Sequence, residues 1–301
     1  MVRLAYVALA LLALCAACSR TTGPPRRTPD YETLLLLQAD FLRYARYDVY
    51  RAAPPLDLSG QNVFRATLAR LDYFESTNPG VNSDIVDFLR GQAAVRLGNY
   101  ASAIEAFGRV AETSESPEVA AKARERLERV WLLREAVQPT EQPENLGAYF
   151  TEIERRRGRL AEIEEQFAGS YDAVLARREL EQADVEYALA LFRNRFLVEG
   201  SSQRALEFAS DMIERHGSSR RVHEHRLMLG RFYLELAQDL AALSPPDRSG
   251  FDAEVFYGLA QAAQREFLTV SLADGYDEKL EAEGLLRTLE AFTRRTRNLE
   301  R

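Results

Sequence analysis

The sequence predicts an all-α protein of stacked antiparallel helical hairpins. Among its 301 residues, good helix formers such as Ala, Leu, Glu and Arg dominate, while glycine (16) and proline (11) are sparse. Runs that alternate β-branched with polar residues are hard to find. Hydrophobic residues make up 46% of the chain and charged residues 28%, which suits one large core or two modest ones. We therefore expect a folded chain of helices joined by turns.

Residues 1–17 predict an export signal. Arg3 supplies a positive start, residues 4–14 are apolar or small, and two alanines precede Cys18. A helix needs about 20 apolar residues to span a bilayer, and the polar residues from Ser19 onward end this run earlier. We expect residues 1–17 to be removed as a signal peptide.

The motif Cys15-Ala16-Ala17-Cys18 resembles the lipobox of bacterial lipoproteins. The resemblance implies that Cys18 is lipidated, becomes the mature N-terminus and anchors the chain to a membrane. Ser19 after the lipidated cysteine is similar to the enterobacterial signal for the outer membrane, facing the periplasm, and the inner membrane is the alternative. An ordinary cleaved signal and a redox or metal-binding Cys-x-x-Cys pair are the other interpretations of these residues.

Residues 18–28 predict an extended tether. The segment after the cysteine is polar and rich in proline, so its reach is about 3 Å per residue. The chain has two cysteines, Cys15 and Cys18. If the first leaves with the signal and the second is acylated, no thiol remains for a disulfide, a metal ligand or a nucleophile.

An N-terminal helical half is expected over residues 29–137. Its first helix begins at Pro29, after Thr28 as the cap, and extends to about residue 51. The second covers about residues 59–77 and ends at an Asn-Pro-Gly turn. The two helices form one hairpin.

The most specific pattern in the chain covers residues 84–117. Small and aromatic residues occur there in a fixed order: Gly91, Gly98, Tyr100, Ala103 and Phe107. This segment resembles a tetratricopeptide repeat (TPR). The resemblance implies that the first glycine lets two helices pack closely, that the Gly-x-Tyr sequence forms the tight turn, and that the last two residues fill the groove between the helices.

A weaker copy of the second-helix pattern begins at Ala205. It lies 102 residues after Ala103, a spacing of three repeats of about 34 residues that irregular helix lengths could also produce. Other apolar patterns of helical length occur at residues 117–136, 148–168, 171–198, 201–216, 219–243, 250–272 and 276–297. We expect a linker at residues 138–147 and a second helical-repeat half over residues 148–301.

Most catalytic signatures can be rejected from the sequence. The two lysines of the chain, Lys122 and Lys279, do not follow a glycine as the lysine of a phosphate-binding loop does. The Gly-x-Ser-x-Gly and His-Glu-x-x-His motifs are absent. Glutamates such as Glu162, Glu164 and Glu165 predict a solvated helix surface in preference to the facing carboxylates of a glycosidase. We expect no enzymatic activity and no cofactor.

The three histidines are close together in the sequence, at His216, His223 and His225. Residues two apart on a helix project about 200° from each other, so the last two would converge only in a loop. We expect solvated or helix-capping histidines and no metal site.

Two groups of residues are candidates for binding. Aromatic rings recur at every third position of the first helix and alternate with arginines: Phe41, Tyr44, Tyr47 and Tyr50 with Arg43 and Arg46. Tyrosine and arginine are enriched at interface hot spots, although these rings could instead pack on the second helix.

The second group is the basic run at residues 155–159, with an echo at Arg294, Arg295 and Arg297. It could meet an acidic partner or anionic lipid headgroups, whereas neighbouring acids favour neutralisation along the helix.

These patterns together predict a membrane-anchored scaffold or adaptor lipoprotein of the periplasm. It would bind protein partners of the cell envelope through a TPR-like groove, in outer-membrane or envelope-complex assembly. The net charge of −7 disfavours nucleic acid as a partner. The alternative is a solute- or glycan-binding lipoprotein whose helical pocket several aromatic rings line. An enzyme acting on cell-wall polymers ranks third and would need two buried carboxyls of raised pKa facing one cleft.

Overall fold

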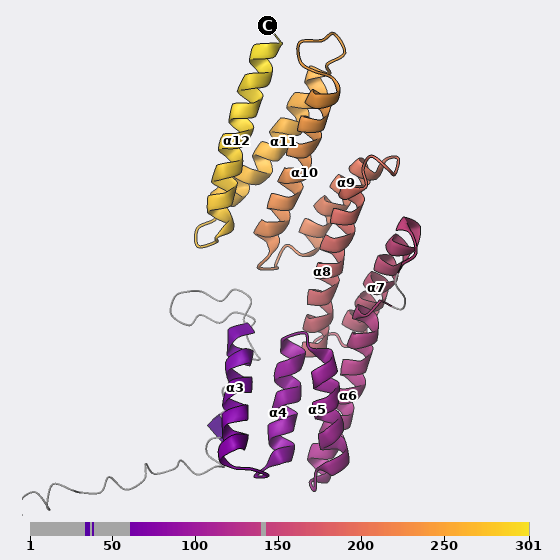
Figure 1. Ribbon diagram of the computed structural model, residues 1–301, viewed down its shortest axis with the longest axis vertical. Helices are drawn as coiled ribbons and strands as arrows, with labels where there is room; N and C mark the ends of the chain where they lie inside the picture. Colours follow the sequence, from indigo (N-terminus) through magenta and orange to yellow (C-terminus); the bar gives the residue numbers. More distant parts are fainter. Residues whose placement is uncertain (1–33, 37, 39–60, 140–142, 301) are drawn as a thin grey trace, which may run out of the picture. The chain divides into compact units, whose positions relative to one another are not determined.

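The computed structural model describes residues 34–36, 38, 61–139 and 143–300 (Figure 1). All regular secondary structure in these ranges is helical, without a strand, and this confirms the all-α prediction. The signal peptide, Cys18, the tether and the aromatic stripe between residues 41 and 50 lie outside the described residues. The chain divides into two compact units, Met1–Leu127 and Glu128–Arg301. The linker expected at residues 138–147 stays a prediction.

The described helices follow one another with short connections. They are α3 (Gln61–Thr77), α4 (Ser83–Arg96), α5 (Tyr100–Thr113), α6 (Pro117–Val137), α7 (Leu146–Gln166), α8 (Tyr171–Arg193), α9 (Ser201–Arg215), α10 (Val222–Leu243), α11 (Ala253–Ser271) and α12 (Glu278–Leu299). The division between the two units falls within α6. Each of these helices was expected from the apolar pattern of the sequence.

One helix end differs clearly from its prediction. The pattern predicted a helix to residue 198, whereas α8 ends at Arg193. Asn194 ends it because the side-chain amide donates to the carbonyl of Ala190 at 2.8 Å. Gly200, at a φ of 69°, then turns the chain into α9. The apolar residues between these two positions belong to the turn.

In the first unit, α3 packs on α4 and α4 packs on α5. The turn between α4 and α5 is compact because Gly98 adopts a φ of 73° and the Asn99 side chain accepts from the backbone N–H of Ser102. Tyr100 and Ala103, which follow this turn, are buried.

Gly91 of α4 lies directly against the ring of Phe107 on α5. A Cβ atom at this glycine would lie 2.7 Å from Cε1 of the ring, closer than carbon atoms pack. The ring is 1% exposed and also meets Phe88 edge to face, with the ring centroids 5.4 Å apart. The absence of a side chain at Gly91 therefore sets how closely the two helices approach.

In the second unit, every helix from α7 to α12 packs on the next in sequence, and α10 also contacts α12 (Figure 1). One apolar core joins α7, α8, α9 and α10, and another joins α10, α11 and α12. Gly230 of α10 repeats the device seen in the first unit, because a Cβ atom there would lie 2.5 Å from Cε1 of Phe267 on α11. Side-chain caps at Asn145, Ser170 and Asp252 begin three of these helices, each stabilising its helix by about 1 kcal/mol.

Candidate binding site on the last helical hairpin

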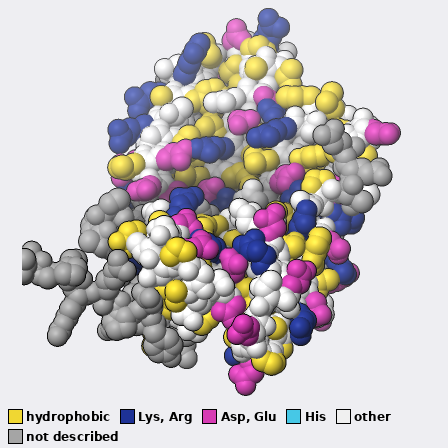
Figure 2. Space-filling model, turned by 60° about the horizontal axis from the view of Figure 1, so that its bottom comes forward, with side chains coloured by type: hydrophobic (Ala, Val, Ile, Leu, Met, Phe, Trp, Pro, Cys, Tyr) yellow, Lys and Arg dark blue, Asp and Glu magenta, His cyan; other side chains and the backbone are white. Residues whose placement is uncertain are grey.

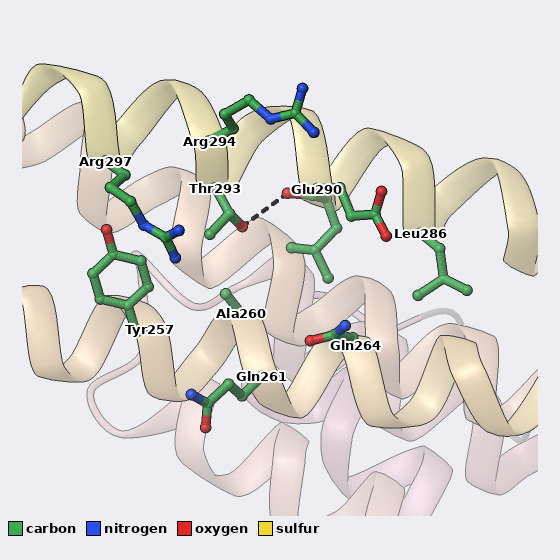
Figure 3. A pocket seen from close by; sticks show the side chains of 10 residues that line it. Tyr257, Ala260, Gln261, Gln264, Leu286, Glu290, Thr293, Arg294 and Arg297 are labelled. Carbon is green, nitrogen blue, oxygen red and sulfur yellow. Dashed lines mark hydrogen bonds between the residues drawn. The ribbon is translucent and has the colours of Figure 1, made fainter.

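A cleft of about 350 Å³ opens between α11 and α12 (Figure 3). Its lining comes from these two helices alone: Tyr257, Ala260, Gln261, Gln264, Leu286, Leu289, Glu290, Thr293, Arg294 and Arg297. The helices are antiparallel neighbours, so the C-terminal third of α12 faces the beginning of α11. The hydroxyl of Tyr257, which donates to Oε2 of Glu300 at 3.0 Å, spans the two helices at that end.

The floor of the cleft is small and apolar. Ala260 of α11 and Leu289 of α12 are both buried, at 5% and 3% exposed. The rings of Phe256 on α11 and Phe292 on α12 meet edge to face, with centroids 5.5 Å apart. The Thr293 hydroxyl donates to the carbonyl of Leu289 at 2.8 Å. The short side chain of Ala260 leaves depth that a larger residue would fill.

The two rims of the cleft differ in charge. On α11 the rim consists of Gln261 and Gln264, whose amides are exposed. On α12 it carries Arg297, which points towards Tyr257, and Arg294, which stands on the outer edge (Figure 3). The Arg297 guanidinium lies 5.9 Å from the centre of the Tyr257 ring. Two arginines therefore stand at one end of the cleft, where the Glu300 carboxylate is already bound by the Tyr257 hydroxyl, and Glu290 lies further along.

Arg294 and Arg297 form no ion pair within the described residues. Many other arginines of the second unit are paired, and basic and acidic side chains are interspersed on the face of the molecule drawn in Figure 2. Burial, followed by the hydrogen bond to Glu300, raises the pKa of Tyr257. The phenol therefore stays protonated and remains a donor beside these two positive charges.

A second cluster of charged groups forms the α8 polar cluster: Glu181, Asp184, Arg157, Arg215, His216 and His225. Its acids and histidines are buried, whereas its two arginines reach the surface. Asp184 is fully buried and accepts from Arg157 of α7, from Arg215 of α9 and from Nε2 of His216 at 2.9 Å. Glu181 accepts from Nε2 of His225 at 2.5 Å. The buried acids therefore find their hydrogen-bond donors within the protein.

Both carboxylates of the α8 polar cluster are held in the ionised form. Burial by itself would raise the pKa of Asp184, but the hydrogen bonds from His216 and Arg157 outweigh it, and the pKa is lowered. The same balance, with His225 as the first hydrogen-bonding group, lowers the pKa of Glu181. Removal of one partner from such a group would leave a charge without its counter-charge, which destabilises a fold.

The expectation of solvated or capping histidines is wrong for His225, which lies within α10 and is 1% exposed. His216 lies at the C-cap of α9, as expected for a capping histidine, but it is 4% exposed and so is not solvated. The end of α9 and the first turn of α10 bring both histidines against the acids of α8. His223 is half-buried against the ring of Tyr276, with centroids 4.3 Å apart. Across the described ranges, no group of three or more His, Cys, Asp or Glu side chains is arranged to hold a metal ion.

The basic run on α7 divides into two kinds of contact. Arg155 and Arg159 pair with glutamates three residues away on the same helix, as the charge pattern predicts. Arg156 and Arg157 instead reach α8, where they contact Glu186 and Asp184. The sequence pattern did not anticipate this, because it does not show which face of α7 meets a neighbour.

The cleft itself was not predicted, although its two arginines were singled out from the sequence. Tyr257, Gln261 and Gln264 carry no recognisable motif. The available signal was the stretch 255–264, which contains no charged residue although several of its side chains are exposed. An uncharged exposed helix face opposite an arginine-rich segment is visible only once the pairing of the helices is known.

A comparison with protein-family models matched no family, and a comparison with curated proteins found none that is similar. Within the described residues, none of the helices combines the length and apolar character needed to cross a bilayer.

Proposed function

We propose that this protein is a lipid-anchored scaffold or adaptor of the bacterial cell envelope, which binds protein partners through a TPR-like array of helical hairpins. The observation that carries the proposal is the cleft between α11 and α12, where Arg294 and Arg297 line an open surface without ion pairs among the described residues. Unpaired arginines beside an apolar floor suit recognition of another macromolecule.

The packing of successive hairpins supports a TPR-like architecture. From α3 to α5 and again from α7 to α12, each helix packs on the next in sequence. Both units contain a glycine that admits an aromatic ring from the next helix, at Gly91 and Gly230. Stacked hairpins of this kind present extended surfaces on which partners bind.

The membrane anchor is supported by the sequence alone. The positive start, the apolar segment and the lipobox-like motif ending at Cys18 fit a lipoprotein signal. Anchoring through Cys18 would place the helical array at a membrane surface, facing the periplasm, with the outer membrane as the favoured location.

The composition of the cleft favours a protein partner over a sugar or another small solute. A solute-binding pocket is expected to enclose its ligand with several aromatic rings, whereas Tyr257 is the single aromatic residue of the lining. The buried acids of α8 are paired with His216 and His225 in the interior. These features support a binding protein without catalytic activity.

The proposal is tested by photo-cross-linking in a lipoprotein-processing bacterium. A photoreactive residue is placed in the full chain at Gln261 on the cleft rim, and in a second strain at Ser210, an exposed position of α9. Discrete cross-linked proteins in the membrane fraction, lost when Cys18→Ala releases the chain, are the expected result. Absence of cross-linked protein at both positions would contradict the scaffold function.

A further inference from the structure

We propose that the cleft between α11 and α12 binds a short extended segment of a partner protein, with an acidic residue at one end and an apolar residue about three positions away. This inference rests on the proposed scaffold function and specifies the chemistry of the partner. Its basis is the order in which charged, amide and apolar side chains occur along the cleft.

The acidic residue is selected by the end of the cleft where the two arginines stand. The Arg297 guanidinium lies beside the Tyr257 ring, and Arg294 stands one helical turn earlier on the rim (Figure 3). Guanidinium groups bind carboxylates with two parallel hydrogen bonds. The α11 rim opposite is uncharged from residue 255 to residue 264, so its residues leave the positive charge available to a ligand.

The apolar residue is selected by the other end. Leu286 is half-buried there, and the buried Leu289 continues the floor towards Ala260. Glu290 lies between this apolar end and the arginines, and it repels a second acid placed near it. The cleft therefore has a direction, with a carboxylate favoured beside Arg297 and disfavoured further along.

The length of the cleft limits the segment to a few residues. Tyr257 and Gln264 mark its two ends on α11, and seven residues of helix rise about 10 Å. An extended chain advances about 3.3 Å per residue, so about three residues span this length. The exposed amides of Gln261 and Gln264 each offer a donor and an acceptor, which matches the alternating N–H and C=O groups of an extended backbone.

The test measures binding of short peptides to the full chain, purified in mild detergent, by fluorescence anisotropy. Two fluorescein-labelled peptides, Glu-Ala-Ala-Leu and Leu-Ala-Ala-Glu, present one acid and one apolar residue three positions apart in both chain directions. Their counterparts with glutamine in place of glutamate serve as controls. At least one glutamate peptide is expected to bind, about tenfold more tightly than its glutamine counterpart, and to weaken as salt is added.

Substitutions locate the binding. Arg297→Gln and Arg294→Gln are each expected to weaken the glutamate peptide by about fivefold, the effect of one exposed ion pair, with the larger loss at Arg297. Arg295→Gln is the matched control, because Arg295 belongs to the same segment of α12 but does not line the cleft. Equal losses for all three variants, equal binding of glutamate and glutamine peptides, or no binding of either peptide would overturn the proposal. Phosphatidylglycerol vesicles test whether this segment of α12 binds lipid headgroups. If the vesicles displaced the bound peptide, and if Arg295→Gln abolished that displacement, the proposal would also be overturned.

The cross-linking positions separate this inference from the proposed function. Partners captured at Ser210 but not at Gln261, together with failed peptide binding, would leave the scaffold function standing and remove the cleft as its site. Peptide binding that depends on Arg297, with no partner captured at either position, would support the cleft chemistry and contradict the scaffold function.

Discussion

His216 lies against Asp184 in the interior of the second unit, with Nε2 of the imidazole 2.9 Å from Oδ2 of the carboxylate. Arg157 and Arg215 donate to the same carboxylate from α7 and α9. One acid on α8 thus joins three successive helices through hydrogen bonds. The arrangement predicts where the second unit is most sensitive to substitution.

Asp184→Asn is expected to destabilise the second unit. The substitution keeps the shape of the side chain but removes the charge that balances Arg157 and Arg215. We expect a loss of about 3 kcal/mol in the free energy of unfolding, the lower end of the range for removing one partner from a buried ion pair. The loss lies at the lower end because both guanidinium groups retain access to water. Urea unfolding followed by circular dichroism measures the change.

Asp211→Asn provides the control for this experiment, because it removes one acid from an exposed position of α9. Its effect should stay within about 0.5 kcal/mol. A similar loss for the two variants would show that net charge, and not the α8 polar cluster, determines the stability of the unit.

The second unit should become less stable in acid, because the buried acids of the α8 polar cluster take up protons there. The pKa values of Asp184 and Glu181 are lowered from their ordinary values of 3.8 and 4.5. The folded state therefore binds fewer protons than the unfolded state near those values. The stability that the two groups contribute is fully present above the ordinary values and is lost as pH falls through the lowered ones.

Urea midpoints measured from pH 7 to pH 3 test this dependence. The variant Asp184→Asn with Glu181→Gln should lose less stability than the unsubstituted protein over the acid part of the range, because it no longer takes up these two protons. Parallel pH profiles for the two proteins would contradict the assignment.

Gly230→Ala should destabilise the packing of α10 on α11. The added methyl group would lie 2.5 Å from the buried ring of Phe267, and overpacking of this kind costs about 1–3 kcal/mol. Gly258→Ala, on α11 where a Cβ atom meets nothing within 4 Å, should instead stabilise by about 0.5–1 kcal/mol. Thermal unfolding distinguishes the two.

Gly91→Ala and Gly108→Ala form an equivalent pair in the first unit. The first would place a Cβ atom 2.7 Å from the ring of Phe107, and the second faces open space. We expect opposite signs for their effects on the free energy of unfolding. If Gly91→Ala were neutral, close packing of α4 on α5 would not depend on this glycine.

The helical elements could be predicted because their signals are local. Apolar periodicity and turn residues such as Gly98 and Asn99 act within a few positions of the chain, and the observed helices follow them. The end of α8 was predicted too late because an apolar stretch continued past Arg193, while the cap at Asn194 is a single residue.

The buried histidines and the cleft depend on contacts between distant residues. His225 meets Glu181, 44 residues earlier, and Tyr257 meets Glu300, 43 residues later. No spacing in the sequence indicates either contact, because both follow from how the helices pair. The arginines of α12 were recognisable as candidates, but their position on a cleft required the structure.

The mass of the mature N-terminal peptide, from the full chain expressed in a lipoprotein-processing bacterium, tests the anchored-scaffold function most directly. The account predicts a peptide that begins at Cys18 and carries acyl chains, and that is lost in the Cys18→Ala variant. A peptide that begins elsewhere, or an unmodified Cys18, would contradict the membrane anchor.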